Sequence, residues 1–183
     1  MSIRSILIIG TPRSGTTSLL NTLSNAFKFK RVFEPFNYNI PNSYDYPFLI
    51  DESVVKICPF QTPVEFGMHS DFLNFVKTYS REFDRTILLT RKNNNEHLES
   101  WHKSISKKES LDDLKIYIDI MYEISKELAI PITEYNELYG MDRNKSLDII
   151  KSWNLNMNNI HINEHLNPKF RYRYFSENTK SLL

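Results

Sequence analysis

The chain has 183 residues, of which 40% are hydrophobic and 25% are charged, so it is long enough for one globular domain with a substantial core. Its 23 lysines and arginines nearly balance its 22 aspartates and glutamates, which excludes the strong basic field of a typical nucleic-acid-binding protein. Cys58, the single cysteine, cannot form an intramolecular disulfide, and no cysteine–histidine spacing predicts a zinc site. We therefore expect one domain over 1–183, with no metal and no nucleic-acid partner.

The sequence gives no sign of a membrane-bound or secreted protein. The apolar stretch near the N-terminus, 6–9, is short and fits the first strand of the fold better than a signal peptide or a membrane span. A single cysteine fits a reducing compartment. We expect a cytoplasmic protein that does not contact a membrane.

The first predicted element is a buried strand formed by this apolar run. The segment 10–17, with the sequence GTPRSGTT, follows it and leads into a predicted helix. The apolar residues of this helix recur at helical spacing and are Leu19, Leu20, Leu23, Ala26 and Phe27. A strand, a glycine-containing turn and a helix start bring unpaired N–H groups and the positive helix end to one point. The pattern therefore predicts an anion-binding loop.

Strand and helix patterns alternate along the rest of the chain. Further strands are predicted over 31–33, 53–58, 86–90, 131–135 and 159–162, and helices over 71–83, 95–107, 111–128 and 145–153. In the long helix the predicted core positions are Leu111, Leu114, Ile118, Met121 and Leu128. The alternation predicts an α/β, three-layer, P-loop-like fold with a mostly parallel sheet flanked by helices. In such folds ligands bind at the carboxyl ends of the strands.

The loop differs from a nucleoside-triphosphate loop in the placement of its cation. Gly10 and Gly15 have the spacing of that motif, but Thr16 stands where its lysine would be. Arg13, inside the loop, offers a fork of donors for a phosphate or sulfate group, and Thr17 adds a hydroxyl. A transferred sulfuryl group carries less negative charge than a γ-phosphoryl group, so its transfer can proceed without magnesium. The loop suits a phosphosulfate.

The segment 11–18, TPRSGTTS, resembles the 5′-phosphosulfate loop of sulfotransferases that use 3′-phosphoadenosine 5′-phosphosulfate (PAPS). The resemblance implies that PAPS is bound by five consecutive residues, Arg13, Ser14, Gly15, Thr16 and Thr17. A second segment, RTILLTR over 85–91 followed by EHLESWH over 96–102, is similar to the family's 3′-phosphate element. On that resemblance Arg91 and Ser100 bind the 3′-phosphate of the nucleotide.

Three weaker similarities extend the resemblance along the chain. The segment VVKI over 54–57 resembles the family's second core strand with its lysine, here Lys56, and 132–138 resembles a late strand and turn. The segment 167–175 interleaves cations with aromatic rings, and the resemblance implies that Arg171, or else Lys169 or Arg173, closes over the nucleotide. From the residues alone, an RNA-contacting tail or a solvated terminal segment explains 167–175 equally well.

Transfer to an alcohol or amine also requires a positioned base. Phe33-Glu34-Pro35 resembles a segment of the carbohydrate-type branch, which implies that Glu34 is the base; a solvated surface carboxylate is the alternative interpretation. Lys56 is expected to stabilise charge on the departing phosphate, or else to be solvated. His102 and His69 are the competing bases. Tyrosines of the loop 37–46 either shape an acceptor pocket or pack onto the core.

The family resemblance thus implies a sulfotransferase that moves a sulfuryl group from PAPS to a hydroxyl or amine of a small-molecule or carbohydrate acceptor. Two alternatives remain: a P-loop small-molecule kinase, and a non-catalytic nucleotide-binding module. The acceptor and the oligomeric state are not encoded in any motif of the sequence.

Overall fold

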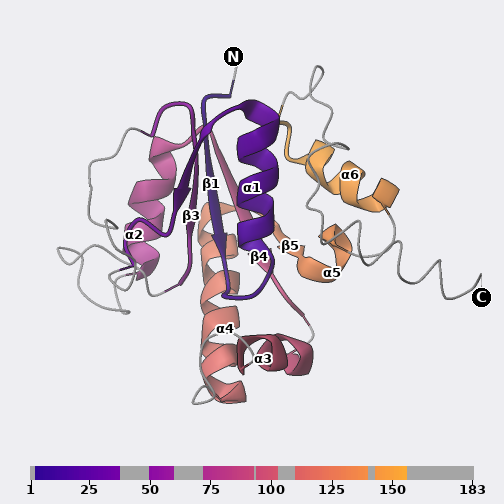
Figure 1. The fold of residues 1–183 in the computed structure, drawn as a ribbon. Helices are drawn as coiled ribbons and strands as arrows, with labels where there is room; N and C mark the ends of the chain where they lie inside the picture. Colours follow the sequence, from indigo (N-terminus) through magenta and orange to yellow (C-terminus); the bar gives the residue numbers. More distant parts are fainter. Residues whose placement is uncertain are drawn as a thin grey trace, which may run out of the picture.

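The protein is described by a computed structural model that covers residues 3–37, 50–59, 72–92, 94–102, 110–139 and 143–155. Five parallel strands form one sheet in the order β2-β3-β1-β4-β5 (Figure 1). The strands are β1 (Ser5–Gly10), β2 (Lys30–Phe33), β3 (Ser53–Ile57), β4 (Arg85–Thr90) and β5 (Ile132–Glu134). The helices are α1 (Thr16–Phe27), α2 (Phe72–Tyr79), the 3-10 turn η3 (Ser80–Glu82), α3 (Asn94–His102), α4 (Leu111–Leu128), α5 (Tyr135–Leu138) and α6 (Arg143–Ser152).

The central strand β1 separates two hydrophobic cores. All six of its residues are buried, and because side chains alternate along a strand, successive residues enter opposite cores. Ile6 and Ile8 pack with residues of α1 and α6, whereas Leu7 and Ile9 pack with residues of α2 and α4. Because both faces of β1 are buried, its sequence is a continuous apolar run and not an alternation of apolar and polar residues.

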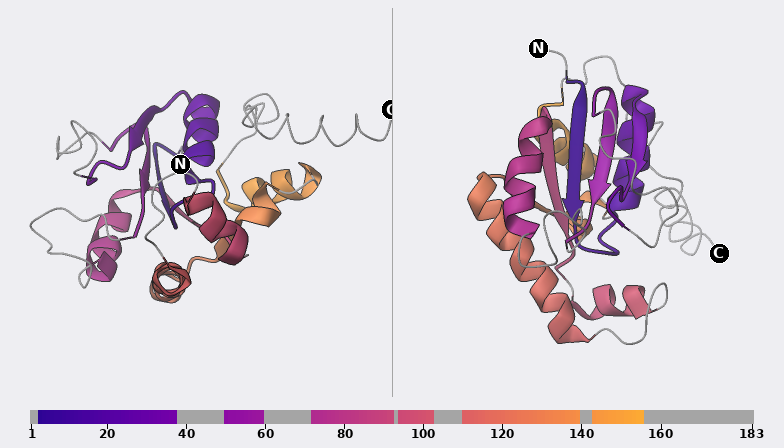
Figure 2. Two further views of the ribbon diagram at one scale, coloured as in Figure 1. Left: turned by 60° about the horizontal axis from the view of Figure 1, so that its bottom comes forward. Right: turned by 90° about the vertical axis from the view of Figure 1, so that its left-hand side faces the viewer.

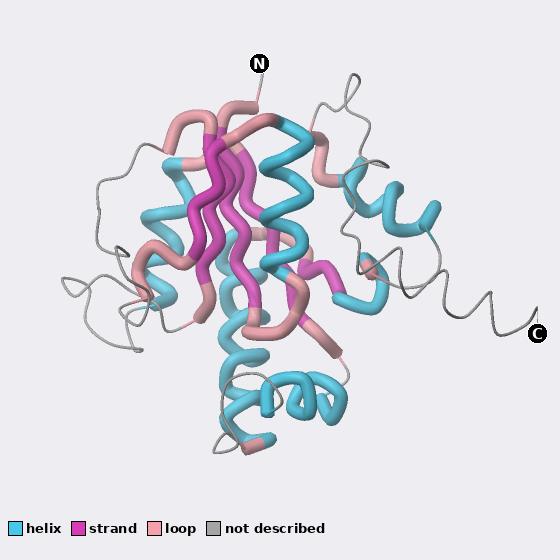
Figure 3. Tube along the Cα trace, viewed as in Figure 1, coloured by secondary structure: helices cyan, strands magenta, loops and turns pink. Residues whose placement is uncertain are grey.

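The helices form one layer on each side of the sheet, as Figures 2 and 3 show. This arrangement confirms the predicted three-layer α/β fold with a parallel sheet. In Figure 2, α3 lies beyond the carboxyl ends of the strands, at the edge where the loop after β1 turns into α1. No helix in the described part of the chain is long and apolar enough to cross a membrane.

The predicted elements agree closely with the observed ones, with two corrections. The strand predicted over 131–135 ends at Glu134, because Tyr135 begins α5. Among the predicted core positions of α4, Leu111 is 38% exposed, since the first turn of α4 extends past the strand ends (Figure 2), and Ile118 and Leu128 are half-buried. Ile124 is buried instead. The predicted strand over 159–162 and the end of the helix over 95–107 lie outside the described residues.

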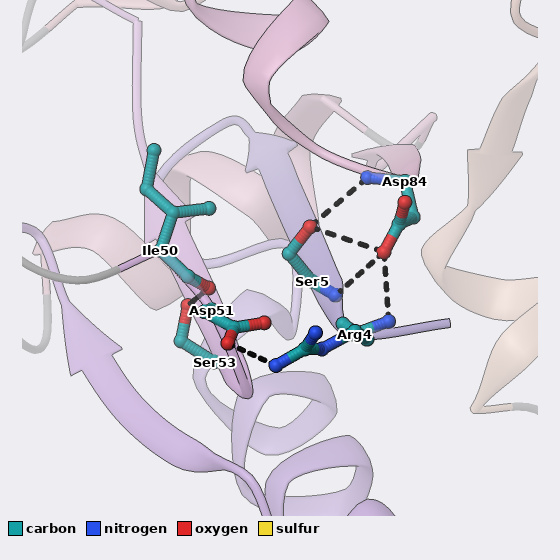
Figure 4. A network of polar contacts seen from close by, with 6 residues as sticks. All are labelled: Arg4, Ser5, Ile50, Asp51, Ser53 and Asp84. Atoms are coloured by element: carbon teal, nitrogen blue, oxygen red, sulfur yellow. Dashed lines mark hydrogen bonds and ion pairs between the residues drawn. The ribbon is translucent and has the colours of Figure 1, made fainter. Parts of the chain in front are cut away.

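A polar cluster ties the amino ends of the strands together (Figure 4). The Asp84 carboxylate accepts hydrogen bonds from the backbone N–H groups of Arg4, at 2.7 Å, and Ser5, at 3.1 Å. The Ser5 hydroxyl in turn accepts from the Asp84 N–H at 3.0 Å, and Arg4 pairs with Asp51 ahead of β3. These contacts fix the starts of β1, β3 and β4, at the edge opposite the predicted ligand site.

Candidate active site

The loop between β1 and α1, which is predicted to bind an anion, has an unusual backbone. Arg13 and Gly15 both have left-handed conformations, with φ angles of 64° and 86°. Glycine is required at position 15 for two reasons: its backbone is left-handed, and a Cβ atom there would lie 2.5 Å from the ring of Tyr139. A Cβ atom on Gly10 would lie 2.5 Å from the carbonyl oxygen of Leu89. Both glycines therefore serve the close packing of this loop against its neighbours.

The start of α1 is free of the groups that normally neutralise a helix N-terminus. Gly15 is the N-cap and makes no side-chain capping bond, and the first turn carries no acidic residue. Leu19 donates to the Gly15 carbonyl at 3.0 Å, so the amides of Thr16 and Thr17 precede the first helical hydrogen bond. Such amides, together with the helix dipole, stabilise a bound anion.

Ser14 has a structural position in the loop. Its side chain is fully buried, and its hydroxyl donates to the carbonyl of Thr11 at 2.6 Å. Its backbone N–H donates to the same carbonyl at 3.2 Å. Both groups therefore stabilise the turn itself. A direct contact of Ser14 with a nucleotide stays a prediction.

Arg13 and Ser100, from the two separate sequence motifs, lie in contact. The Nε atom of Arg13 donates to the Ser100 hydroxyl at 3.3 Å, although the residues are 87 positions apart. Ser100 is carried by α3, which lies beyond the strand ends. The fold therefore brings the predicted 5′-phosphosulfate loop and the predicted 3′-phosphate helix together.

Arg91 is a buried cation at the end of β4. Only 8% of its surface is exposed, and its guanidinium lies 4.6 Å from the centre of the Tyr135 ring. One terminal nitrogen donates to Glu96 at 2.9 Å, but the buried Nε atom has no hydrogen-bond partner among the described residues. An unsatisfied donor on a buried cation is costly, and an anionic ligand would satisfy it.

Glu34 and Lys56 form a buried ion pair at the carboxyl ends of β2 and β3. Phe33 pairs with Lys56 in the parallel register, and the Glu34 N–H donates to the Lys56 carbonyl at 2.9 Å. Lys56 is 4% exposed and Glu34 9% exposed, and the lysine donates to one carboxylate oxygen. Asn37 donates to the other carboxylate oxygen at 2.6 Å. The alternative interpretation of Glu34, a solvated surface carboxylate, therefore does not match its buried position.

Lys56 also connects this pair to the predicted anion-binding loop. Its Nζ atom lies 3.3 Å from the hydroxyl of Thr17 in the first turn of α1, and 4.3 Å from the centre of the Phe33 ring. Glu34 has a left-handed φ of 46°, a conformation that is strained for a non-glycine residue. The candidate base Glu34, the candidate cation Lys56 and the first turn of α1 are thus next to one another. The left-handed backbone at Glu34 is part of this arrangement.

Cys58 completes the surroundings of the carboxylate without being reactive itself. Its Sγ atom lies 3.6 Å from Glu34. Burial, the largest influence, raises the pKa of the thiol to about 12 even though Lys56 opposes the shift. The thiol stays protonated at neutral pH, which excludes Cys58 as a nucleophile.

Sequence reasoning assigned no role to three residues of this region, although two of them lie inside segments that it singled out. His97 is fully buried in α3 and contacts the carbonyl of Pro12 through Nε2. Tyr139 donates its hydroxyl to the Gly15 carbonyl at 2.9 Å, and Tyr135 packs beside it and below Arg91. The only available signal was position: His97 follows Arg91 within the predicted 3′-phosphate element.

Several predictions fall outside the described residues. These concern Arg171, His69 and the tyrosines of 38–46. His102 is the last residue of α3. In the described ranges, no group of three or more histidine, cysteine, aspartate or glutamate side chains is arranged to hold a metal ion.

Comparisons with models of known protein families, with curated proteins and with solved structures gave no significant match.

Proposed function

We propose that the protein is a sulfotransferase that moves the sulfuryl group of PAPS to a hydroxyl or amine of a small-molecule or carbohydrate acceptor. The observation that carries the proposal is the contact between Arg13 and Ser100, because it joins the two motifs that would bind opposite ends of one nucleotide. The buried Glu34–Lys56 pair beside the same loop supplies a candidate base and a candidate cation.

In this proposal the 5′-phosphosulfate lies against the start of α1. The amides of Thr16 and Thr17 and the Arg13 side chain bind its oxygens, and the left-handed loop keeps those donors directed to one point. The 3′-phosphate lies near Arg91 and Ser100, where the unsatisfied Nε atom of Arg91 gains an acceptor. The phosphosulfate and the 3′-phosphate of the nucleotide thus neutralise the charges of Arg13 and Arg91.

The chemical step needs one base and one electrophilic group. The acceptor oxygen forms a bond to sulfur as its proton passes to the Glu34 carboxylate. The bond between sulfur and the bridging oxygen breaks, and its electron pair stays on the departing 5′-phosphate. Lys56 stabilises the charge that develops on that oxygen. The products are a sulfated acceptor, adenosine 3′,5′-bisphosphate and one proton.

The ion pair explains how both groups are held before substrates bind. Lys56 lies between the Glu34 carboxylate and the Thr17 hydroxyl, so a phosphosulfate on the loop competes with Glu34 for the ammonium group. Movement of Lys56 toward the donor weakens its bond to the carboxylate and makes Glu34 a stronger base. Donor binding would thereby activate the base.

The first experiment measures thermal unfolding with adenosine 3′,5′-bisphosphate and, separately, with ATP and magnesium. Ligand at about 100 times its dissociation constant adds about 2.7 kcal/mol of stability, a rise of about 5–10 °C for a chain of this size. R13A should lose most of the shift, whereas R31A, which replaces an exposed arginine of β2, should keep it. A shift with ATP and magnesium alone would refute the proposal and favour a kinase.

Turnover separates the enzyme from a binding module. In an acceptor screen with PAPS, E34Q should keep bisphosphate binding but lose about a hundredfold or more in turnover, the usual scale for a general base. Tight bisphosphate binding without turnover on any acceptor would instead favour a non-catalytic module.

A further inference from the structure

We propose that His97 is a positioning residue of the anion-binding loop. By donating from Nε2 to the Pro12 carbonyl, it fixes the orientation of the Arg13 backbone amide and links the loop to α3. The proposal rests on the proposed nucleotide site, since it states how the two ends of that site are kept in register. No motif or resemblance assigned a role to His97.

The contact is made by a fully buried side chain. His97 is 0% exposed, and its ring approaches a loop residue that is 85 positions away in the chain. A carbonyl oxygen can only accept, so the ring nitrogen facing Pro12 carries the proton. His97 therefore satisfies the Pro12 carbonyl from a fully buried position.

The hydrogen bond controls the orientation of one peptide unit. The Pro12 carbonyl and the Arg13 N–H belong to the same planar peptide, in which the two groups point in opposite directions. Holding the carbonyl therefore fixes the direction of the Arg13 amide. This peptide precedes the left-handed residue Arg13, with its φ of 64°, where the backbone needs outside support to stay in one conformation.

A second contact holds the other end of the loop. The Tyr139 hydroxyl donates to the Gly15 carbonyl at 2.9 Å, so the turn is fixed from α3 on one side and from the residue after α5 on the other. His97 lies between Arg91 and Ser100 in the chain, the two residues expected at the 3′-phosphate. Ser100 is on the same helix as His97, so a shift of α3 would move the loop and Ser100 together.

The first test measures hydrogen exchange of the free protein over the loop, in peptides covering 10–20. H97Q should exchange at the wild-type rate, because the glutamine amide nitrogen can reach the position of Nε2. H97N has the same polarity but is one methylene shorter, so its loop amides should exchange at least about threefold faster. W101F changes a buried residue of the same helix that packs on Tyr117 and lies beside His97, with 6.4 Å between the ring centres. It is the control for loosened packing around His97 without loss of the bond to Pro12.

The second test titrates adenosine 3′,5′-bisphosphate by calorimetry. H97N should bind about tenfold more weakly than the wild type, the scale of a lost buried hydrogen bond, and H97Q should bind within about threefold. Equal loop exchange in H97N, H97Q and W101F would overturn the positioning role. If H97N loosens the loop but the wild-type protein does not bind the bisphosphate, the coupling is supported and the proposed function is refuted.

Discussion

The buried Glu34–Lys56 pair allows the sharpest test of the site, through the substitution Lys56→Met. The two side chains are 5% and 11% exposed, so removing the ammonium group leaves a carboxylate buried without its counter-charge. Breaking a buried pair in this way costs about 3–5 kcal/mol. At about 2–4 °C per kcal/mol for a chain of this size, the melting temperature should fall by about 6–20 °C.

The assay is urea and thermal unfolding of K56M, E34Q and the double variant, with K115M as the matched control. Lys115 pairs with Asp112, but their side chains are 59% and 86% exposed, so K115M should change stability by less than about 1 kcal/mol. The double variant should recover part of the loss of K56M, because no buried charge remains unpaired. If K56M is no more destabilising than K115M, the pair is not buried as described, and Glu34 is not a base that Lys56 holds in place.

Three further predictions concern the surroundings of the site. G15A should lose about 1–3 kcal/mol in urea unfolding, because Gly15 has a φ of 86°; wild-type stability would contradict the loop conformation. Cys58, whose pKa burial raises to about 12, should react with a thiol reagent at pH 8 only after denaturation, and rapid reaction of the native protein would contradict its burial. Burial chiefly, with the charges of Arg91 and Arg13, lowers the pKa of His97 below 6.5, so the folded state binds fewer protons than the unfolded state. The free energy of unfolding should therefore fall as the pH drops below 6.5, and it should fall less in H97Q.

The fold was predictable because its strands are buried on both faces and its helices are strongly patterned. The apolar run of β1 and the helical spacing of apolar residues over 111–128 were clear local signals. The helix α4 begins at the predicted residue, and the structure shows a capping box of Ser110 and Asp113 at that point. Leu111 was assigned wrongly because periodicity describes the face of a helix and not how far the helix extends beyond its neighbours. The strand predicted through Tyr135 ends one residue earlier, because Tyr135 is the first residue of α5.

The candidate site was predictable only as a set of separate motifs. Strand order decides that Glu34 and Lys56 are neighbours, because β2 and β3 pair in parallel with Phe33 opposite Lys56. The rotation of α3 decides that His97 faces the loop. Strand order and helix rotation cannot be predicted from the local sequence, so the ion pair and the His97 contact are known only from the structure.

The ion pair also answers a physical problem that the proposed chemistry raises. A base beside a phosphosulfate must be buried enough to exclude water, yet a buried carboxylate is unstable without a counter-charge. Lys56 supplies that charge in the free protein, and it is close enough to Thr17 to turn toward an anion on the loop. One cation can therefore stabilise the carboxylate first and the departing phosphate later. This makes the order of events testable: a carboxylate-specific reagent should modify Glu34 more readily when adenosine 3′,5′-bisphosphate is bound, and protection by the nucleotide would refute the exchange of partners.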